Sequence, residues 1–473
     1  MNVCLVFFEM GNQVYCHLGT ASLSAVLKQD GHKTSLVKIH KKNGFHRLAK
    51  EIVASGPDVI GLSFVSNYFD LAADLAKRIK TIEKVPIVVG GMHATVAPEQ
   101  CIASEYFDFV CVGEGEAAIK KFINAYANNG DVYHVPNIWS KKDNSVIRND
   151  IGTFVDLNEL PPPDIDLFYD NPEDVKKITY MSQRGCPYSC TYCCNNYLNK
   201  LYKDKGKTVR KSDLSKVFDD LEFLIRRHPN VKDIAFEDDT FTVDKKRVLE
   251  FCALYKEKIG LPFSINSRPE FINTETAQAL KNANCVRVNV GIESGDEVFR
   301  KNVLHRKMTN DSIREAFTVL KNVGLNTRTF VILGFPGETE EHMRKSYDLL
   351  SEINPSDGTQ VSVFYPFEGT ELYNLCKERK LLTERKKDTF FGSGSTLNFD
   401  KKQSRLIKKY FYLCQELHHK SGNNEIYIKR YYPYLLWLYK LLTLFFAPRV
   451  IWDLMYRSRN YYLKPPFRMH RGW

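Results

Sequence analysis

The sequence has little of what a membrane-spanning or fibrous protein needs. Residues 434–447 form an apolar stretch of only 14 residues that includes Lys440, whereas a spanning helix needs about 20 apolar residues. Long Gly/Ser or Gln/Asn tracts and internal repeats are also missing, which excludes extensive disorder and repeat architectures. The opening apolar run, residues 3–8, lacks a basic leader and a cleavage site. We therefore interpret it as a β-strand and expect a cytoplasmic protein.

The cysteine pattern of a secreted, disulfide-bonded protein is missing as well. The chain has 12 cysteines, and outside one cluster they are scattered over its length. In a reducing compartment, a tight cysteine cluster indicates metal binding instead. The scattered cysteines in apolar or helical surroundings are predicted to be core residues, and they are Cys4, Cys101, Cys252, Cys285, Cys376 and Cys414.

The chain is too long for one ordinary domain, and its pattern changes along its length. Over residues 1–145, strand patterns alternate with helical patterns, as in a doubly wound, Rossmann-like α/β domain. Three prolines mark a linker over residues 146–174. Strands and helices alternate again over residues 175–385, as a partial, TIM-like (β/α)6 barrel requires. Residues 386–473 are predicted to be a basic, aromatic-rich helical region.

Small residues follow three successive strands of the first domain. Sheets of this class bind ligands at the carboxyl ends of their strands, and glycine allows the backbone to approach a bulky ligand closely. The alternative explanation is that these glycines only form ordinary turns. Because they follow three successive strands, a ligand site at this edge is predicted instead. Its residues are Gly61 and Ser63, then Gly90, Gly91 and His93, then Gly113, Glu114, Gly115 and Glu116.

The second domain begins with a strand at residues 178–182 that leads into the cysteine cluster. Cys186, Cys190 and Cys193 have the spacing Cys-x3-Cys-x2-Cys. A structural zinc site usually has four ligands in paired spacings, whereas three thiolates on one loop can hold three irons of a cubane cluster. The fourth iron is then open to chelate the amino and carboxylate groups of a substrate. The adjacent Cys194 is interpreted as a bystander.

Both domains resemble cobalamin-dependent radical SAM enzymes, to about residue 400. The cysteine loop resembles the radical SAM signature, and the glycine segments resemble the cobalamin-binding domain that precedes many radical SAM domains. The resemblance implies a [4Fe–4S] cluster on the three cysteines, S-adenosylmethionine, and cobalamin at the glycine segments. It places the contacts to S-adenosylmethionine at Tyr192, Glu237, Asp238, Asp239, Asn266, Arg268, Glu293, Ser294 and Gly334.

The chain departs from one pattern of cobalamin proteins. Many of them supply a histidine to cobalt from an Asp-x-His-x-x-Gly motif after the first strand. His32 lies in a similar motif, but Ser35 replaces the glycine and the segment follows the first predicted helix. His17 lies in the expected loop without the motif, and His93 is expected to contact backbone or phosphate. We therefore expect no histidine below the cobalt.

Many members of this family methylate unactivated carbon, and the resemblance implies that activity. One S-adenosylmethionine would methylate reduced cobalamin, and a second would yield a 5′-deoxyadenosyl radical that activates the substrate. The expected partners are a small-molecule substrate and an electron donor such as flavodoxin or ferredoxin. The aromatic tail favours a hydrophobic substrate, such as an isoprenoid or another lipid.

The tail itself has three interpretations. Residues 401–473 contain 15 Lys or Arg but only 3 Asp or Glu, and 17 of the 59 aromatic residues. These features fit a helical cap on the barrel or a helix lying in the membrane interface, at the inner face of the membrane. A nucleic-acid contact is the third interpretation and is ranked last.

Three alternative functions remain. Relatives with the same parts close rings, oxidise or rearrange their substrates, and the sequence does not separate these reactions from methyl transfer. A tRNA methylthiotransferase would need three more cysteines for a second cluster. Cys4, Cys16, Cys101 and Cys111 are available by number, but Cys4 and Cys111 lie in predicted strands. A cobalamin sensor is disfavoured because all three cluster cysteines are present.

Overall fold

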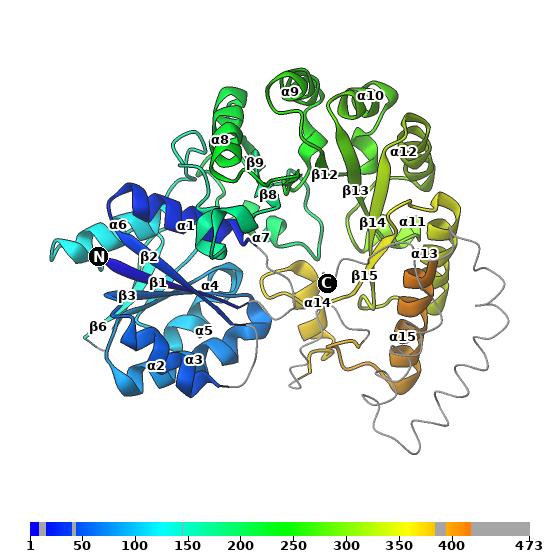
Figure 1. The fold of residues 1–473 in the computed structure, drawn as a ribbon. Coiled ribbons are helices and arrows are strands. Elements are labelled where there is room, and N and C mark those ends of the chain that lie inside the picture. The colour runs from blue at the N-terminus through cyan, green and yellow to red at the C-terminus, as the bar shows by residue number, and fades with distance from the viewer. Residues whose placement is uncertain (9–15, 40–43, 144, 384–393, 418–473) are drawn as a thin grey trace, which may run out of the picture.

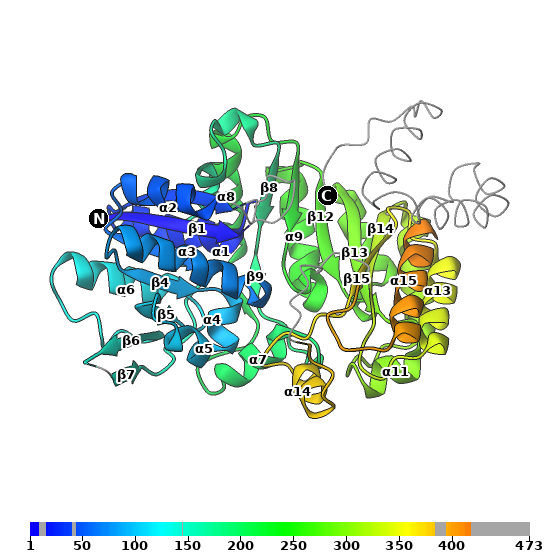
Figure 2. The ribbon, with the colours of Figure 1, turned by 90° about the horizontal axis from the view of Figure 1, so that it is seen from below.

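Two α/β domains lie side by side in the computed structural model (Figure 1). The structure describes residues 1–8, 16–39, 44–143, 145–383 and 394–417. Figure 2 shows the same arrangement from below, with helices α7 and α14 next to the boundary between the domains. The predicted fold class, a doubly wound domain followed by a partial barrel, is confirmed.

The first domain is built on a seven-stranded sheet in the order β2-β1-β3-β4-β5-β6-β7. Its first five strands are parallel, and β6 and β7 add an antiparallel edge. The strands are β1 (Asn2–Phe8), β2 (Lys33–Ile39), β3 (Val59–Ser63), β4 (Ile87–Gly90), β5 (Phe109–Cys111), β6 (Ile138–Lys142) and β7 (Ser145–Arg148). The helices are α1 (Leu18–Gln29), α2 (Phe45–Ala54), α3 (Phe69–Ile82), α4 (Met92–Val96), α5 (Pro98–Ala103) and α6 (Glu116–Ala127).

Alternating strand residues build two cores, one on each face of this sheet. Cys4 and Val6 of β1 pack with α2 and α3 on one face. Val3 and Leu5 of the same strand pack with α1 and α6 on the other. Because successive strand side chains point to opposite faces, both faces must be apolar and covered by helices. The carboxyl edge of the sheet is then the part that is left for a ligand.

The second domain is a six-stranded parallel sheet in the order β8-β11-β12-β13-β14-β15. Its strands are β8 (Lys177–Tyr180), β11 (Asp233–Phe236), β12 (Phe263–Ser267), β13 (Cys285–Glu293), β14 (Asn326–Leu333) and β15 (Thr359–Val363). A separate two-stranded antiparallel sheet pairs β9 (Gln183–Arg184) with β10 (Arg210–Lys211). The helices are α7 (Cys194–Leu201), α8 (Leu214–Arg227), α9 (Lys245–Lys258), α10 (Thr274–Asn282), α11 (Glu297–Asn302), α12 (Asn310–Val323), α13 (Glu340–Ile353), α14 (Glu371–Glu378) and α15 (Lys401–Glu416).

Helix α12 illustrates why the sequence folds locally as it does. Thr309 caps its first turn, where its side chain accepts a hydrogen bond from the Ser312 N–H. Gly324 ends the helix in the left-handed conformation that glycine adopts readily. Between these ends, residues at helical spacing turn inward and pack on the sheet, and they are Ile313, Ala316, Phe317 and Leu320.

The segments around the two domains differ in part from the predicted division. Strand β7 ends at Arg148, so the first sheet continues beyond residue 145, into the predicted linker. Helix α15 packs against β15 and α13 and thus adds to the barrel. The apolar stretch of residues 434–447 lies outside the described residues. Within the described part of the chain, no helix has both the length and the apolarity needed to cross a membrane.

Candidate functional site

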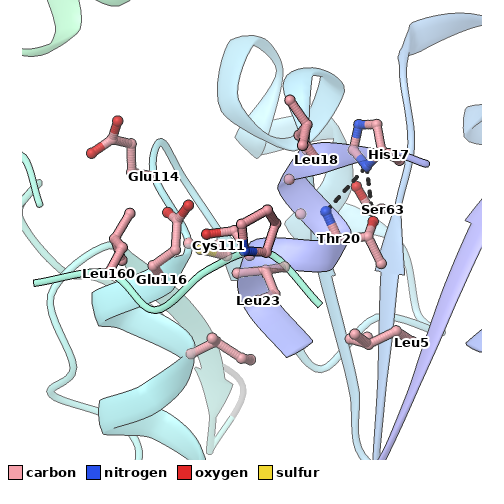
Figure 3. A pocket seen from close by; sticks show the side chains of 18 of the residues that line it. Leu5, His17, Leu18, Thr20, Leu23, Ser63, Cys111, Glu114, Glu116 and Leu160 are labelled. Atoms are coloured by element: carbon pink, nitrogen blue, oxygen red, sulfur yellow. Dashed lines mark hydrogen bonds between the residues drawn. The ribbon is translucent and has the colours of Figure 1, made fainter. Parts of the chain in front are cut away.

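A cavity of about 350 Å³ opens at the carboxyl ends of β1, β3, β4 and β5, where the sequence predicted a ligand. This volume lies within the usual range of ligand pockets. Figure 3 shows residues from α1, from the ends of the strands and from the linker around it. Eight of the nine predicted residues line it, namely Gly61, Ser63, Gly90, Gly91, Gly113, Glu114, Gly115 and Glu116.

Apolar side chains and glycines make the wall of this cavity. The apolar part includes Leu5, Leu23 and Val88. Gly113 has φ of +87°, and a Cβ there would lie 2.2 Å from the Tyr202 hydroxyl, so no other residue fits without displacing that tyrosine. The linker closes another side with Leu157, Leu160, Pro161 and Pro163. These features fit the cobalamin-binding role that the sequence predicted.

His93 is the exception among the predicted residues. It lies in α4, where its side chain is 2% exposed, and it is not among the residues that line the cavity. Its Nδ1 lies 2.9 Å from the Ser66 hydroxyl and 3.8 Å from a carboxylate oxygen of Glu368. Rings of Phe64 and Phe69 pack against it. His93 therefore joins the first domain to the barrel and stands apart from the ligand edge.

His17 does line the cavity, as the N-cap residue of α1. Burial lowers its pKa to about 4, so its ring is neutral at pH 7. Its Nδ1 accepts a hydrogen bond from the Thr20 N–H at 3.2 Å (Figure 3), and the neutral ring must then carry its proton on Nε2. The structure thus gives His17 a role at the start of α1. That no histidine ligates cobalt stays a prediction. His32 contacts Asn124 and does not line the cavity.

The three predicted cluster cysteines lie on one loop between β9 and α7. Cys190 is buried, whereas Cys186 and Cys193 are half-buried. Thr191 fixes the middle of the loop, because its hydroxyl donates to the Val303 carbonyl at 2.7 Å. Asn199 of α7 donates to the Cys186 carbonyl at 3.0 Å. The loop is thereby tied to two separate parts of the barrel.

Within the described residues, no three His, Cys, Asp or Glu side chains converge on a point that one metal ion could occupy. The thiolates of a cubane each bind a different iron, so a cluster does not require such convergence. Cys194 begins α7 and directly follows Cys193. The loop therefore does not resemble a closed, single-ion zinc site.

The three acidic residues after β11 have different surroundings. Asp238 is fully buried and accepts hydrogen bonds from the Ser182 hydroxyl and the Gln183 N–H, at 3.0 and 2.7 Å. Burial raises its pKa to about 7. The exposed Asp239 accepts from the Gly185 N–H at 3.2 Å and from Asn195 at 2.8 Å. These two carboxylates thus brace the cysteine loop.

Glu237, the third acid, is half-buried and contacts the barrel interior. It accepts a hydrogen bond of 3.3 Å from Asn266 at the end of β12. Asn266 in turn accepts one of 3.0 Å from Asn289 of β13. The buried Oδ1 of Asn289 has no hydrogen-bond partner. A chain of amide and carboxylate groups therefore runs from the carboxyl end of β11 past the end of β12 to the middle of β13, close to the edge where polar ligand groups are expected.

Two arginines bring positive charge to the buried cysteine. Nη1 of Arg268 lies 3.9 Å from Sγ of Cys190, and Nη1 of Arg306 lies 3.8 Å from the same sulfur. Arg268 also stacks on Tyr188, and Arg306 donates to the Tyr192 hydroxyl at 3.3 Å. The Nε atoms of both arginines are buried without a hydrogen-bond partner. Arg268 is already paired with Glu270 at 2.7 Å, but each buried Nε–H still lacks an acceptor, which the sulfurs of a bound cluster or a carboxylate ligand would supply.

Three further residues were predicted to contact S-adenosylmethionine, and their surroundings differ. Glu293 is buried with φ of +64°, and burial raises its pKa although Arg306 and Arg268 oppose this. Ser294 is fully buried, and its hydroxyl accepts from the Asp296 N–H at 3.3 Å. This bond turns Ser294 toward α11, so it acts in the local turn. Gly334 has φ of +81° at the end of β14.

The sequence predictions missed Arg306 and Glu338. Arg306 lies in the segment between α11 and α12. The sequence did not identify it as a site residue, because it does not follow a predicted strand. Glu338 accepts hydrogen bonds from the N–H groups of Gly334 and Phe335. Its burial raises its pKa to about 8, so it is largely protonated at pH 7. The sequence Gly-Phe-Pro-Gly-Glu carried this signal, because a carboxylate can close the turn that its glycines make.

Comparisons with known proteins agree with this geometry. The family model of the B12 binding domain matches residues 12–123, and that of the radical SAM superfamily matches residues 180–350. The chain belongs to the radical SAM enzymes that carry a B12-binding domain. Its cofactors are a [4Fe–4S] cluster, S-adenosylmethionine and cobalamin.

Similar proteins extend over most of the chain. An uncharacterized methyltransferase of Pyrococcus horikoshii is 27% identical over 83% of this chain and 86% of its own. An anaerobic magnesium-protoporphyrin IX monomethyl ester cyclase of Rubrivivax gelatinosus is 23% identical over 69% of this chain and 60% of its own. The solved structure of the radical enzyme OxsB with aqua-cobalamin and S-adenosylmethionine bound has a TM-score of 0.65 at 18% identity, covering 97% of this chain and 71% of its own. That structural likeness concerns the fold.

Proposed function

We propose that this radical SAM enzyme transfers a methyl group to an unactivated carbon of a hydrophobic, lipid-like substrate. The observation that carries the proposal is the closeness of the two cofactor sites in one chain. Arg184 lines the glycine-rich cavity, and Cys186 of the cluster loop follows two residues later. When bound, the cluster with S-adenosylmethionine supplies hydrogen abstraction from carbon, and cobalamin supplies a methyl group.

The residues of the chain have separate roles in this proposal. Cys186, Cys190 and Cys193 hold the cluster, and the paired guanidinium groups of Arg268 and Arg306 offset its negative charge. The polar groups at the ends of β11, β12 and β13 orient S-adenosylmethionine. The apolar cavity wall holds cobalamin and keeps water away from its reactive face.

The proposed substrate class rests on the composition of the tail. The aromatic residues beyond residue 417 favour a hydrophobic substrate, and the tail that carries them lies outside the described residues. We propose in addition that an electron donor such as flavodoxin or ferredoxin reduces the cluster. The name of the Pyrococcus horikoshii relative supports methyl transfer as the reaction.

Labelled methyl groups test the proposed reaction. The reconstituted enzyme is given a lipid extract, a reductant and S-adenosylmethionine with an isotopically labelled methyl group. The proposal expects labelled product and 5′-deoxyadenosine in the same reaction, and a Cys190→Ala variant should form neither. Formation of 5′-deoxyadenosine with an altered but unlabelled product would refute methyl transfer.

A second candidate is a cyclisation, oxidation or rearrangement with the same cofactors. The name of the Rubrivivax gelatinosus relative, a cyclase, favours this candidate, although this chain spans only 60% of that protein. The labelling experiment separates the two functions, because only methyl transfer places the label in the product.

A tRNA methylthiotransferase, the third candidate, needs a second cluster in the first domain. Cys4 and Cys101 lie in the core on one face of the sheet. Cys111 lies in the core on the other face, and Cys16 packs with the core of the barrel. This distribution over three separate cores opposes a shared cluster. Iron analysis provides the test, since one cubane gives about four irons for each chain and two give about eight.

A further inference from the structure

Four charged side chains connect the cobalamin cavity to the strand that leads into the cysteine loop. Nη2 of Arg184 donates to a carboxylate oxygen of Glu116 at 2.7 Å. Arg210, opposite Arg184 in the antiparallel β9–β10 pair, forms a two-pronged ion pair with Glu114, with distances of 2.5 and 3.2 Å. Arg184 also lies 3.5 Å from Glu114. We call Arg184, Arg210, Glu114 and Glu116 the interdomain ion network.

Burial makes this network different from surface ion pairs. The Glu116 side chain is 6% exposed and that of Arg210 is 14% exposed. Burial alone would raise the pKa of Glu116, but the charge and hydrogen bond of Arg184, together with hydrogen bonds from Ser22 and the Glu116 backbone, hold that pKa below its usual value. Removing one partner of a buried pair leaves an uncompensated charge, which costs far more than loss of an exposed pair.

Aromatic and backbone contacts hold the network in place. The Arg210 guanidinium lies 3.9 Å from the ring centre of Phe154, which stacks on Tyr202 at 4.0 Å. The Tyr202 hydroxyl accepts from the Glu114 N–H at 2.7 Å. The Val155 N–H donates to the Glu114 carboxylate at 3.1 Å. Linker, first domain and barrel therefore meet at a single carboxylate.

The network is connected rigidly to the cluster loop. On the barrel side, Asp238 accepts from the Gln183 N–H, directly before Arg184. On the other side, Gly185 has φ of +89°, and a Cβ there would lie 2.0 Å from the Thr208 carbonyl oxygen. Cys186 follows at once. A displacement of Arg184 must therefore move the first cluster cysteine.

We propose that the interdomain ion network positions the cluster relative to cobalamin. Glu114 and Glu116 border the cavity, yet their carboxylates bind arginines of the barrel, so their role is to couple the two cofactor sites. This inference rests on the proposed function, because it requires both cofactors in one catalytic cycle. Arg184 and Glu116 are positioning residues in this scheme.

The test uses reconstituted holoenzyme with Arg184→Met, Glu116→Gln and both changes together. Reduced cluster and cob(II)alamin are both paramagnetic, so electron paramagnetic resonance measures the dipolar coupling between them. We expect one narrow distribution of couplings in the native protein and at least a doubled width in each variant. The dissociation constant of hydroxocobalamin should rise about tenfold, which corresponds to about 1.4 kcal/mol. The double variant should be no worse than either single variant.

The chain offers a matched control in Arg148 and Glu99. They form a similar two-pronged pair, with both distances 2.8 Å, but both lie on the exposed surface of the first domain. Arg148→Met should change neither the coupling nor the dissociation constant. Arg184→Lys should restore part of the narrow distribution, because it keeps the charge but loses the fork of donors.

The outcomes separate this inference from the function on which it rests. Because Arg184→Met can unfold the protein, Glu116→Gln, which keeps the side-chain size, is the second variant. Unchanged coupling in folded Glu116→Gln protein would overturn the inference and leave the proposed function standing. Native protein that binds no cobalamin, or that shows no coupling between the two centres, would overturn both.

Discussion

Replacement of Arg306 by methionine should make the cluster harder to reduce. Arg306 is buried, and its Nη1 lies 3.8 Å from Sγ of Cys190. At that distance, one full charge interacts with another by about 4 kcal/mol at an effective dielectric constant of 20. The electron added on reduction is shared over the whole cluster, so we assign about a quarter of this energy, about 1 kcal/mol. For a one-electron couple this corresponds to about 40 mV.

The assay is a redox titration of the reconstituted protein, followed by the electron paramagnetic resonance signal of the reduced cluster. Arg306→Met should lower the midpoint potential by about 40 mV or more, and Arg306→Lys should lower it less because it keeps the charge. Arg287→Met is the control, since Arg287 lies near the amino end of β13 and pairs with Asp357. A cluster that stays intact in Arg306→Met with an unshifted potential would refute the reasoning.

Three further predictions concern stability and cobalamin binding. Burial raises the pKa of Glu338 to about 8, so the native protein loses stability as the pH rises from about 4.5 through 8. Glu338→Gln should remove this loss. Melting temperatures of both proteins at pH 6 and pH 9 test this, because the difference between the two proteins should be larger at pH 9. Gly113→Ala should weaken hydroxocobalamin binding at least tenfold, because the added Cβ would displace Tyr202; unchanged affinity in an equilibrium titration would contradict the assigned cavity. Phe236 packs in an aromatic core with Phe251 and Phe263. Phe236→Ala should therefore lower the free energy of unfolding by about 3–5 kcal/mol. A loss of less than about 1 kcal/mol in a denaturant titration would show that this core is not tightly packed.

The sequence predicted well those features that depend on local patterns. The predicted alternation of strands and helices in the first domain is found, for example in α1 (Leu18–Gln29) followed by β2 (Lys33–Ile39), since an apolar face repeats at a fixed spacing. The cavity lies where glycines follow parallel strands, because the topology brings the carboxyl ends of those strands together. The cysteine loop was recognisable because its three ligands lie within eight residues of sequence.

Features that depend on contacts between distant residues were harder to predict. The sequence did not reveal that Asp238 braces β9, or that Glu114 and Glu116 bind arginines 68 to 96 residues away. His93 was assigned to the ligand edge because it follows a strand, but its helix turns it toward Ser66. Side-chain direction after a strand end is set by the next few backbone torsions, which composition does not specify.

The central claim is that one chain holds a cubane with an open iron next to cobalamin. Anaerobic reconstitution, followed by metal analysis and by detection of 5′-deoxyadenosine after reduction, tests it most directly. The account predicts about four irons and about one cobalt for each chain, with 5′-deoxyadenosine formed by native protein and lost when Cys186, Cys190 or Cys193 is replaced by alanine. Protein that binds no such cluster, or that forms no 5′-deoxyadenosine with its cluster reduced, would contradict it.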